Sequence, residues 1–90
     1  SYVKSVSIPL AKDGIRINAI APGNILFNES VWDIKQKKDP SGVKSYIDQN
    51  VPLKTFGSPV DIGNLAVYLA SPISKFSTGS IWTIDGGQTA

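Results

Sequence analysis

Cysteine, histidine and methionine are all absent from this sequence of 90 residues. Without cysteine and histidine we expect no disulfide, no thiolate nucleophile, no serine–histidine relay and no metal site of the usual zinc type. The sequence also has neither a basic-then-apolar leader nor an apolar run that approaches the roughly 18 residues of a membrane-spanning helix. We therefore expect a cytoplasmic protein that does not associate with membranes.

The sequence has few charges. Charged residues make up 18% of the chain, and the formal net charge is +2. The basic cluster Lys35, Lys37 and Lys38 has no interleaved aromatic residues of the kind that bind nucleic acids. We interpret the cluster as a solvated face and expect no nucleic-acid partner.

The hydrophobic content of 41% predicts a folded globular segment. A chain of this length buries only about 60–65% of its unfolded surface, so it folds alone only if its own elements close a core. Because the chain starts at Ser1 and lacks methionine, we also expect sequence to be missing upstream.

The first part of the chain predicts a helix followed by a strand. Residues 1–12 carry apolar side chains at helical spacing, and Gly14 follows where a helix end favours a left-handed residue. Pro9 either kinks this helix or makes it restart, because proline removes a backbone hydrogen bond. Ile15–Ala21 then runs into Pro22-Gly23 as a largely buried strand. This order of elements is typical of a doubly wound α/β sheet.

The last part predicts a second helix and a second strand. Ser58 can cap the helix, Pro59 fits its first position, and Asp61 can reach back to the cap. An apolar stripe from Ile62 to Leu69 follows, and then the strand Ser80–Ile84. Two strands make an incomplete sheet with exposed apolar edges, so we expect this chain to need further strands from elsewhere.

Between these parts, Asn24 to Phe56 has weak periodicity, with short helices predicted over Ser30–Lys37 and Ser41–Asn50. The segment is too long for a plain connection. Excursions of this length in compact domains are either functional lids and binding loops or surface insertions.

Several short motifs occur in one order at workable spacings. They are GIRINAIAPG at 14–23, GSPVDI at 57–62, LAS at 69–71, TG at 78–79 and DGG at 85–87. Together they resemble the C-terminal portion of the short-chain dehydrogenase/reductase family. The resemblance covers nearly the whole chain and implies an α/β fold, in which residues 1–90 are the C-terminal segment of one Rossmann-type domain with a doubly wound parallel sheet. The segment would hold the last two strands, their flanking helices and a substrate lid at about residues 26–50, and would not be a complete domain.

The resemblance implies a cofactor, NAD or NADP, at the carboxyl end of the first strand, where open α/β sheets bind ligands. Family members bind the nicotinamide carboxamide with the backbone just after a Pro-Gly pair, which assigns this role to Asn24 and Ile25. The cofactor-binding turn would then consist of Pro22, Gly23, Asn24 and Ile25. Glycine would leave room for a flat ring to approach the backbone. The alternative is a tight turn that only ends a buried strand. Many members carry threonine where this sequence has Phe27, so Phe27 packs on the nicotinamide, lines the substrate pocket or belongs to the core.

Substrate specificity in the family comes largely from the lid. The candidate wall residues of the lid are apolar or aromatic, namely Phe27, Val31, Trp32, Val43, Tyr46 and Ile47. Trp32 has the alternative role of packing the lid onto the body. Such a wall favours a small-molecule carbonyl or secondary alcohol that has some apolar surface.

We expect no catalytic residue in this chain. The family's serine, its tyrosine with a lysine four residues later, and its glycine-rich diphosphate loop would lie in a missing N-terminal half. Tyr2 and Lys4 are two residues apart, which places them on different faces of a helix. Tyr46 and Tyr68 have no lysine four residues on.

The resemblance thus implies part of an NAD(P)-dependent oxidoreductase that transfers a hydride between nicotinamide and a carbonyl or hydroxyl carbon. A 3-oxoacyl-carrier-protein reductase and a sugar or alcohol dehydrogenase both fit, and the 90-residue chain alone should be inactive. The helix after Ser58 and the last strand would form a two-fold interface in a homodimer or homotetramer, with Ile81, Trp82 and Ile84 as apolar anchors. The alternative is a non-catalytic remnant that acts only as a binding or oligomerisation module.

Overall fold

The computed structural model describes residues 1–90. In chain order its elements are α1 (Tyr2–Lys12), β1 (Ala19–Pro22), α2 (Val31–Lys38), α3 (Pro40–Asn50), α4 (Pro59–Ala70), the short 3-10 helix η1 (Pro72–Ser74) and β2 (Ile81–Ile84). The two strands are parallel, with Ala19 opposite Ile81 and Pro22 opposite Ile84. A parallel pair joined by a helical crossover confirms the predicted α/β class.

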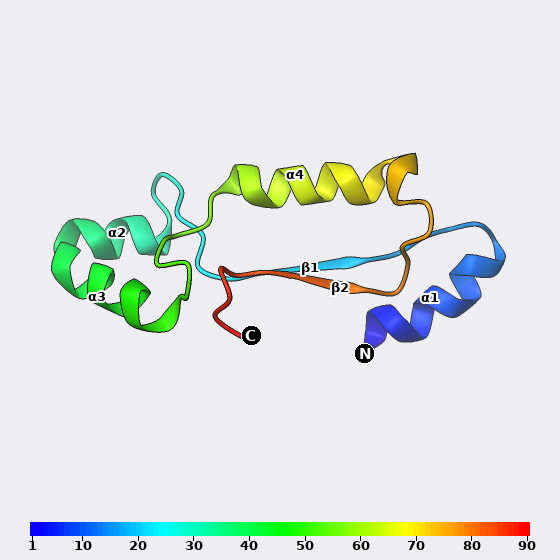
Figure 1. Ribbon diagram of the computed structural model, residues 1–90. Helices are drawn as coiled ribbons and strands as arrows, with labels where there is room; N and C mark the ends of the chain where they lie inside the picture. Colours follow the sequence, from blue (N-terminus) through cyan, green and yellow to red (C-terminus); the bar gives the residue numbers. More distant parts are fainter.

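The elements form a long body with a separate lobe at one end (Figure 1). In this view α4 lies along one side of the strand pair, and α1 lies on the other side near the amino ends of the strands. Helices α2 and α3 form the lobe beyond the carboxyl ends of the strands. The molecule measures 51 × 23 × 19 Å along its principal axes. No helix combines the length and the apolar character needed to cross a bilayer.

Caps set the helix boundaries. The Ser58 hydroxyl accepts a hydrogen bond from the Asp61 amide, and the Asp61 carboxylate accepts one from the Ser58 amide, which completes the predicted capping box. Ser30 caps α2 through the amide of Asp33, and Asp39 caps α3 through the amide of Gly42. The two predicted lid helices are therefore confirmed, with ends that differ from the prediction by about one residue.

Two predictions for the first part of the chain need correction. Helix α1 continues through Pro9, so the helix does not restart there. The first strand begins at Ala19 rather than Ile15. Ile17 bonds to the loop before β2 instead of to a strand, because its amide donates to the Thr78 hydroxyl and its carbonyl accepts from the Gly79 amide. Ladder pairing therefore starts only where β2 begins.

The best-buried apolar residues belong to the lid lobe. They are Val43, Ile47 and Val51, with exposed fractions of 8%, 3% and 2%. No residue of α4 is buried, and its predicted apolar stripe is only half covered by the strands. The lid thus has a small core of its own, whereas the body around the sheet leaves much apolar surface exposed.

Candidate functional site

The candidate site is built around the backbone that follows β1. Ile25 lies opposite Gly57 in an isolated parallel bridge. The Gly57 amide donates to the Asn24 carbonyl at 3.0 Å, and the Leu26 amide donates to the Gly57 carbonyl at 2.9 Å. These two bonds fix the chain at the carboxyl end of the sheet and tie the start of the lid to the segment before α4.

The bridge leaves the backbone groups of Ile25 itself free. Neither its N–H nor its C=O makes a hydrogen bond within the chain. In an extended strand the N–H and C=O of one residue point toward the same edge, here the edge opposite Gly57. The pair therefore offers one donor and one acceptor side by side, which is the complement of a primary carboxamide.

An open pocket of about 690 Å³ lies beside this turn. It gathers residues from the turn, the start of the lid and the first turns of α4: Pro22, Gly23, Ile25, Phe27, Ser30, Val31, Trp32, Pro59, Ile62 and Gly63. Three of the four predicted cofactor residues and three of the six predicted lid residues therefore line one pocket.

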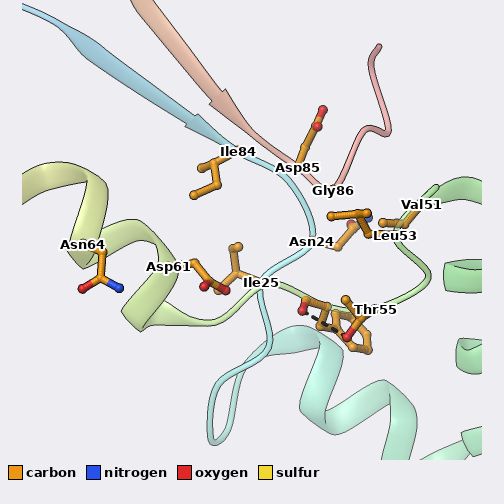
Figure 2. A pocket seen from close by; sticks show the side chains of 12 residues that line it. Asn24, Ile25, Val51, Leu53, Thr55, Asp61, Asn64, Ile84, Asp85 and Gly86 are labelled. Carbon is orange, nitrogen blue, oxygen red and sulfur yellow. Dashed lines mark hydrogen bonds between the residues drawn. The ribbon is translucent and has the colours of Figure 1, made fainter. Parts of the chain in front are cut away.

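Asn24 lines a second cavity. It has a volume of about 460 Å³ and is also lined by Ile25, Val51 and Ile84. Figure 2 shows Ile84 pointing from β2 toward the α4 side and Asp85 pointing away from it. The Asn24 side-chain amide donates to the Gln88 side-chain oxygen at 2.6 Å. This amide thus links the turn to the chain after β2.

The other three predicted lid residues do not line the open pocket. Val43 and Ile47 lie in the small core of the lid lobe. The Tyr46 ring lies 5.2 Å from the Trp32 ring, and the Phe56 ring lies 5.4 Å from it, with all three centroids forming one cluster. Val43 and Ile47 thus stabilise the lobe, and Tyr46 supports Trp32. Trp32 lines the open pocket, and its ring also contacts Phe56 in the segment before α4.

Gly23 also has a structural role that the sequence did not reveal. A β-carbon at Gly23 would lie 2.6 Å from the β-carbon of Asp85 and 2.8 Å from its α-carbon. Glycine is therefore needed there for the close approach of the two strand ends. The approach of a flat ring to Gly23 stays a prediction.

The Asp85 carboxylate organises the chain after β2. It accepts hydrogen bonds from the Thr89 hydroxyl at 2.6 Å, the Thr89 amide at 3.0 Å and the Gly87 amide at 2.9 Å. These bonds, led by the Thr89 hydroxyl, hold the pKa of Asp85 below its ordinary value, because they favour the ionised carboxylate.

A second carboxylate holds the start of the lid. Asp33 accepts from the Glu29 amide at 2.8 Å and from the Lys37 ammonium at 3.1 Å. Glu29 has a left-handed backbone with φ of 65°, so its turn needs such support. The hydrogen bond from the Glu29 amide is the largest cause of the lowered pKa of Asp33, and the bond from Lys37 is the second largest.

Sequence reasoning missed Ser30 and the residues from α4, which are Pro59, Ile62 and Gly63. A usable signal was present for the α4 residues. A crossover helix between parallel strands starts at the edge where the first strand ends, so the first turns of α4 must lie near Pro22-Gly23.

Tyr2 and Lys4 lie away from this site. The Lys4 ammonium donates to the Gly79 carbonyl at 3.2 Å, immediately before the amino end of β2. Ile25 follows the carboxyl end of β1, at the other end of the sheet. The two residues therefore do not form an acid–base pair beside the turn.

Residues 1–89 match the protein family described as enoyl-(acyl carrier protein) reductase. The chain belongs to the short-chain dehydrogenase/reductase family. The chain is 38% identical to isoepoxydon dehydrogenase patN of Penicillium expansum over 86 residues. The aligned segment covers 96% of this chain and 33% of that protein.

Solved structures agree with the short-chain dehydrogenase/reductase fold. A 4-hydroxyisoleucine dehydrogenase complexed with NADH matches with a TM-score of 0.83 and 34% identity, over 98% of this chain and 35% of that one. An L-sorbose reductase from Gluconobacter frateurii, complexed with NADPH and L-sorbose, matches with a TM-score of 0.79 and 32% identity, over 98% and 36%. The chain thus spans about a third of the length of the relatives it matches.

Proposed function

We propose that this chain is the C-terminal segment of an NAD(P)-dependent oxidoreductase that transfers a hydride between nicotinamide and a carbonyl or hydroxyl carbon. In this proposal the segment supplies the nicotinamide-side turn at Pro22–Ile25, one wall of the substrate pocket and part of an oligomer interface. The tyrosine, lysine and serine of the family would come from the rest of the polypeptide, so this chain supplies no catalytic residue.

The free backbone of Ile25 is the observation that carries the proposal. Its N–H and C=O lack partners within the chain, although the neighbouring Leu26 amide and Asn24 carbonyl are both bonded. Unpaired backbone groups are costly when buried, so a segment that closes over them should pair them. A nicotinamide carboxamide would satisfy both groups and hold the ring against Pro22-Gly23. NAD and NADP share this carboxamide, so the turn accepts either.

The exposed apolar surface supports a larger Rossmann-type domain. β1 pairs only with β2, so its other edge carries unpaired backbone groups. A recess beside β1, lined by Ile20, Ala66 and Leu69 among others, leaves the α4 side of the strand open. We infer that further parallel strands and helices from the N-terminal part of the same domain cover these surfaces.

The apolar residues expected to anchor a two-fold interface do not share one face of β2. Ile81 lies on the opposite face of β2 from Trp82 and Ile84, because side chains alternate along a strand. Trp82 packs against Tyr68 of α4, with ring centroids 6.2 Å apart. The three residues therefore cannot form one set of anchors. Val60 and Val67 on the exposed side of α4 are better candidates for a two-fold contact. Sedimentation of the complete polypeptide should show a dimer or tetramer, and a monomer at micromolar concentration would contradict this part of the proposal.

The proposed function is tested by measuring whether deuterium is transferred from the cofactor to a ketone. The complete polypeptide would be incubated with NADH or NADPH deuterated at nicotinamide C4 and a panel of ketones. We expect deuterium on the new carbinol carbon of at least one product, detected by mass spectrometry. Cofactor binding without deuterium transfer to any of a broad set of carbonyl compounds would instead favour a non-catalytic binding or oligomerisation module.

A further inference from the structure

The open pocket is separated from the charges of the lid by Trp32. No residue that lines the pocket carries a charged side chain. Lys35 lies with its ammonium 5.1 Å from the Trp32 ring centroid, and it shares with Lys38 a different recess, between α2 and α3. The lid is rich in lysine, yet the pocket receives none of these ammonium groups.

The remaining lysine of α2 is also directed elsewhere. Lys37 pairs with Asp33 at 3.1 Å across one helical turn. Asp33 in turn supports the Glu29 amide, so both members of the pair are engaged in holding the start of the lid. This pair therefore gives the pocket neither a cation nor an anion.

Besides the indole N–H of Trp32, the pocket has one polar side chain, that of Ser30, and its hydroxyl oxygen is already used. It accepts from the Asp33 amide at 3.1 Å and from the Phe27 amide at 3.3 Å, and Ser30 is only 6% exposed. A ligand with several hydroxyls would lose hydrogen bonds to water at this wall and find few replacements.

The apolar side chains, by contrast, are available to a ligand. Phe27 is 54% exposed and Val31 is 67% exposed. The Trp32 ring contacts the Tyr46 and Phe56 rings, and it lines the pocket. Covering such surface stabilises a complex because it removes apolar area from water.

We propose that this wall makes the enzyme selective for uncharged ketones or secondary alcohols with an apolar ring, against carboxylate, phosphate and polyhydroxylated substrates. This proposal rests on the proposed function, since it names the substrate class of the same site. An apolar ring in the pocket would contact the Phe27 and Trp32 side chains that line it, while an anion placed there would lose its hydration without gaining a cation from this wall.

The test uses two ketones that differ only in charge. The complete polypeptide would be assayed with NADH and NADPH on 4-methylcyclohexanone and on 4-oxocyclohexanecarboxylate. We expect kcat/KM to favour the neutral ketone by about tenfold or more, because the carboxylate lacks a partner at this wall. Calorimetric binding of both ketones to the enzyme with oxidised cofactor gives a readout that does not depend on turnover.

Two lysine variants on the same helix sharpen the test. Val31→Lys places an ammonium in the pocket, whereas Ile34→Lys places one on α2 outside it. Val31→Lys should lower KM for the carboxylate and raise it for the neutral ketone, so that the preference shrinks by about tenfold. Ile34→Lys should leave the preference unchanged.

The outcomes separate the two proposals. Equal or better use and binding of the carboxylate by the unmodified enzyme would overturn the substrate class while leaving hydride transfer intact. The same shift in both lysine variants would show that the wall at Val31 does not determine selectivity, which also overturns it. If neither ketone nor any other carbonyl compound accepted hydride, the proposed function would fail, and tighter binding of the neutral ketone would still support the apolar wall.

Discussion

A β-carbon on Gly23 would lie 2.6 Å from the β-carbon of Asp85, which is closer than real side chains approach. Gly23→Ala should therefore destabilise the complete polypeptide by about 1–3 kcal/mol, because the backbone of the second strand end must shift. Urea unfolding measures this loss. Gly63→Ala is the control, since nothing lies within 4 Å of the added carbon. Alanine in that helix should stabilise by about 0.5–1 kcal/mol. Equal unfolding midpoints for the two variants would contradict the close approach.

The Arg16 guanidinium holds the end of α4. It donates to the carbonyls of Leu69 at 2.9 Å, Ser71 at 3.2 Å and Ser77 at 3.1 Å. Arg16→Lys keeps the charge but loses the planar fork, so we expect a loss of about 1–3 kcal/mol in the free energy of unfolding. Lys75→Arg is the reverse exchange at an exposed position and should change stability by less than about 0.5 kcal/mol. Indistinguishable effects of the two exchanges would show that the three carbonyl bonds contribute little.

The Asp33 carboxylate should make the lid sensitive to acid. Its pKa in the folded protein lies below the ordinary value of 3.8, so its contribution to stability is fully present above that value. The contribution is lost as the pH falls through the lowered folded pKa. Asp33→Asn should therefore destabilise the protein at neutral pH, and the difference from the unmodified protein should shrink below pH 3.8. Equilibrium unfolding at a series of pH values measures this difference.

Asp48→Asn provides a matched control for the Asp33 variant. It removes an exposed ion pair of the same spacing, Lys44–Asp48 at 3.0 Å, and should cost less than about 0.5 kcal/mol. A stability difference for Asp33→Asn that persists unchanged in acid would contradict the role given to the ionised carboxylate.

The 90-residue chain by itself should not transfer hydride. Proton transfer to the substrate oxygen needs an ionisable group within hydrogen-bond reach, and the structure places none of the expected kind beside Ile25. Purified chain would be assayed with assorted ketones and both reduced cofactors. Turnover that follows the chain through purification and disappears in Tyr2→Phe would show that the catalytic tyrosine is Tyr2.

The sequence predicted well those features that depend on neighbouring residues. Ser58, Pro59 and Asp61 start α4 through contacts within one helical turn, and all of these contacts are visible in the sequence. The lid helices were also predicted, although their periodicity is weak. The structure shows that Ser30 and Asp39 provide local caps for them.

Features that depend on distant residues were predicted poorly. Gly23 meets Asp85 across 62 positions of the chain, so the sequence did not reveal this reason for the glycine. The predicted strand started too early, at Ile15. A strand needs a partner to pair with, and β2 begins only at Ile81, which lies opposite Ala19. Apolar spacing also could not separate Val43 and Ile47, which face the lobe core, from Val31, which faces the pocket.

Residue-resolved hydrogen exchange at Ile25 tests the central claim most directly. The amide of Ile25 has no partner within the chain, whereas the Leu26 amide donates to Gly57 at 2.9 Å and serves as an internal control. In the complete polypeptide, saturating NAD or NADP should slow exchange at Ile25 by about tenfold or more, since the amide gains a hydrogen bond to the carboxamide. Exchange at Leu26 should be slow with and without cofactor. If the cofactor binds and Ile25 exchanges as fast as before, the turn does not hold the nicotinamide.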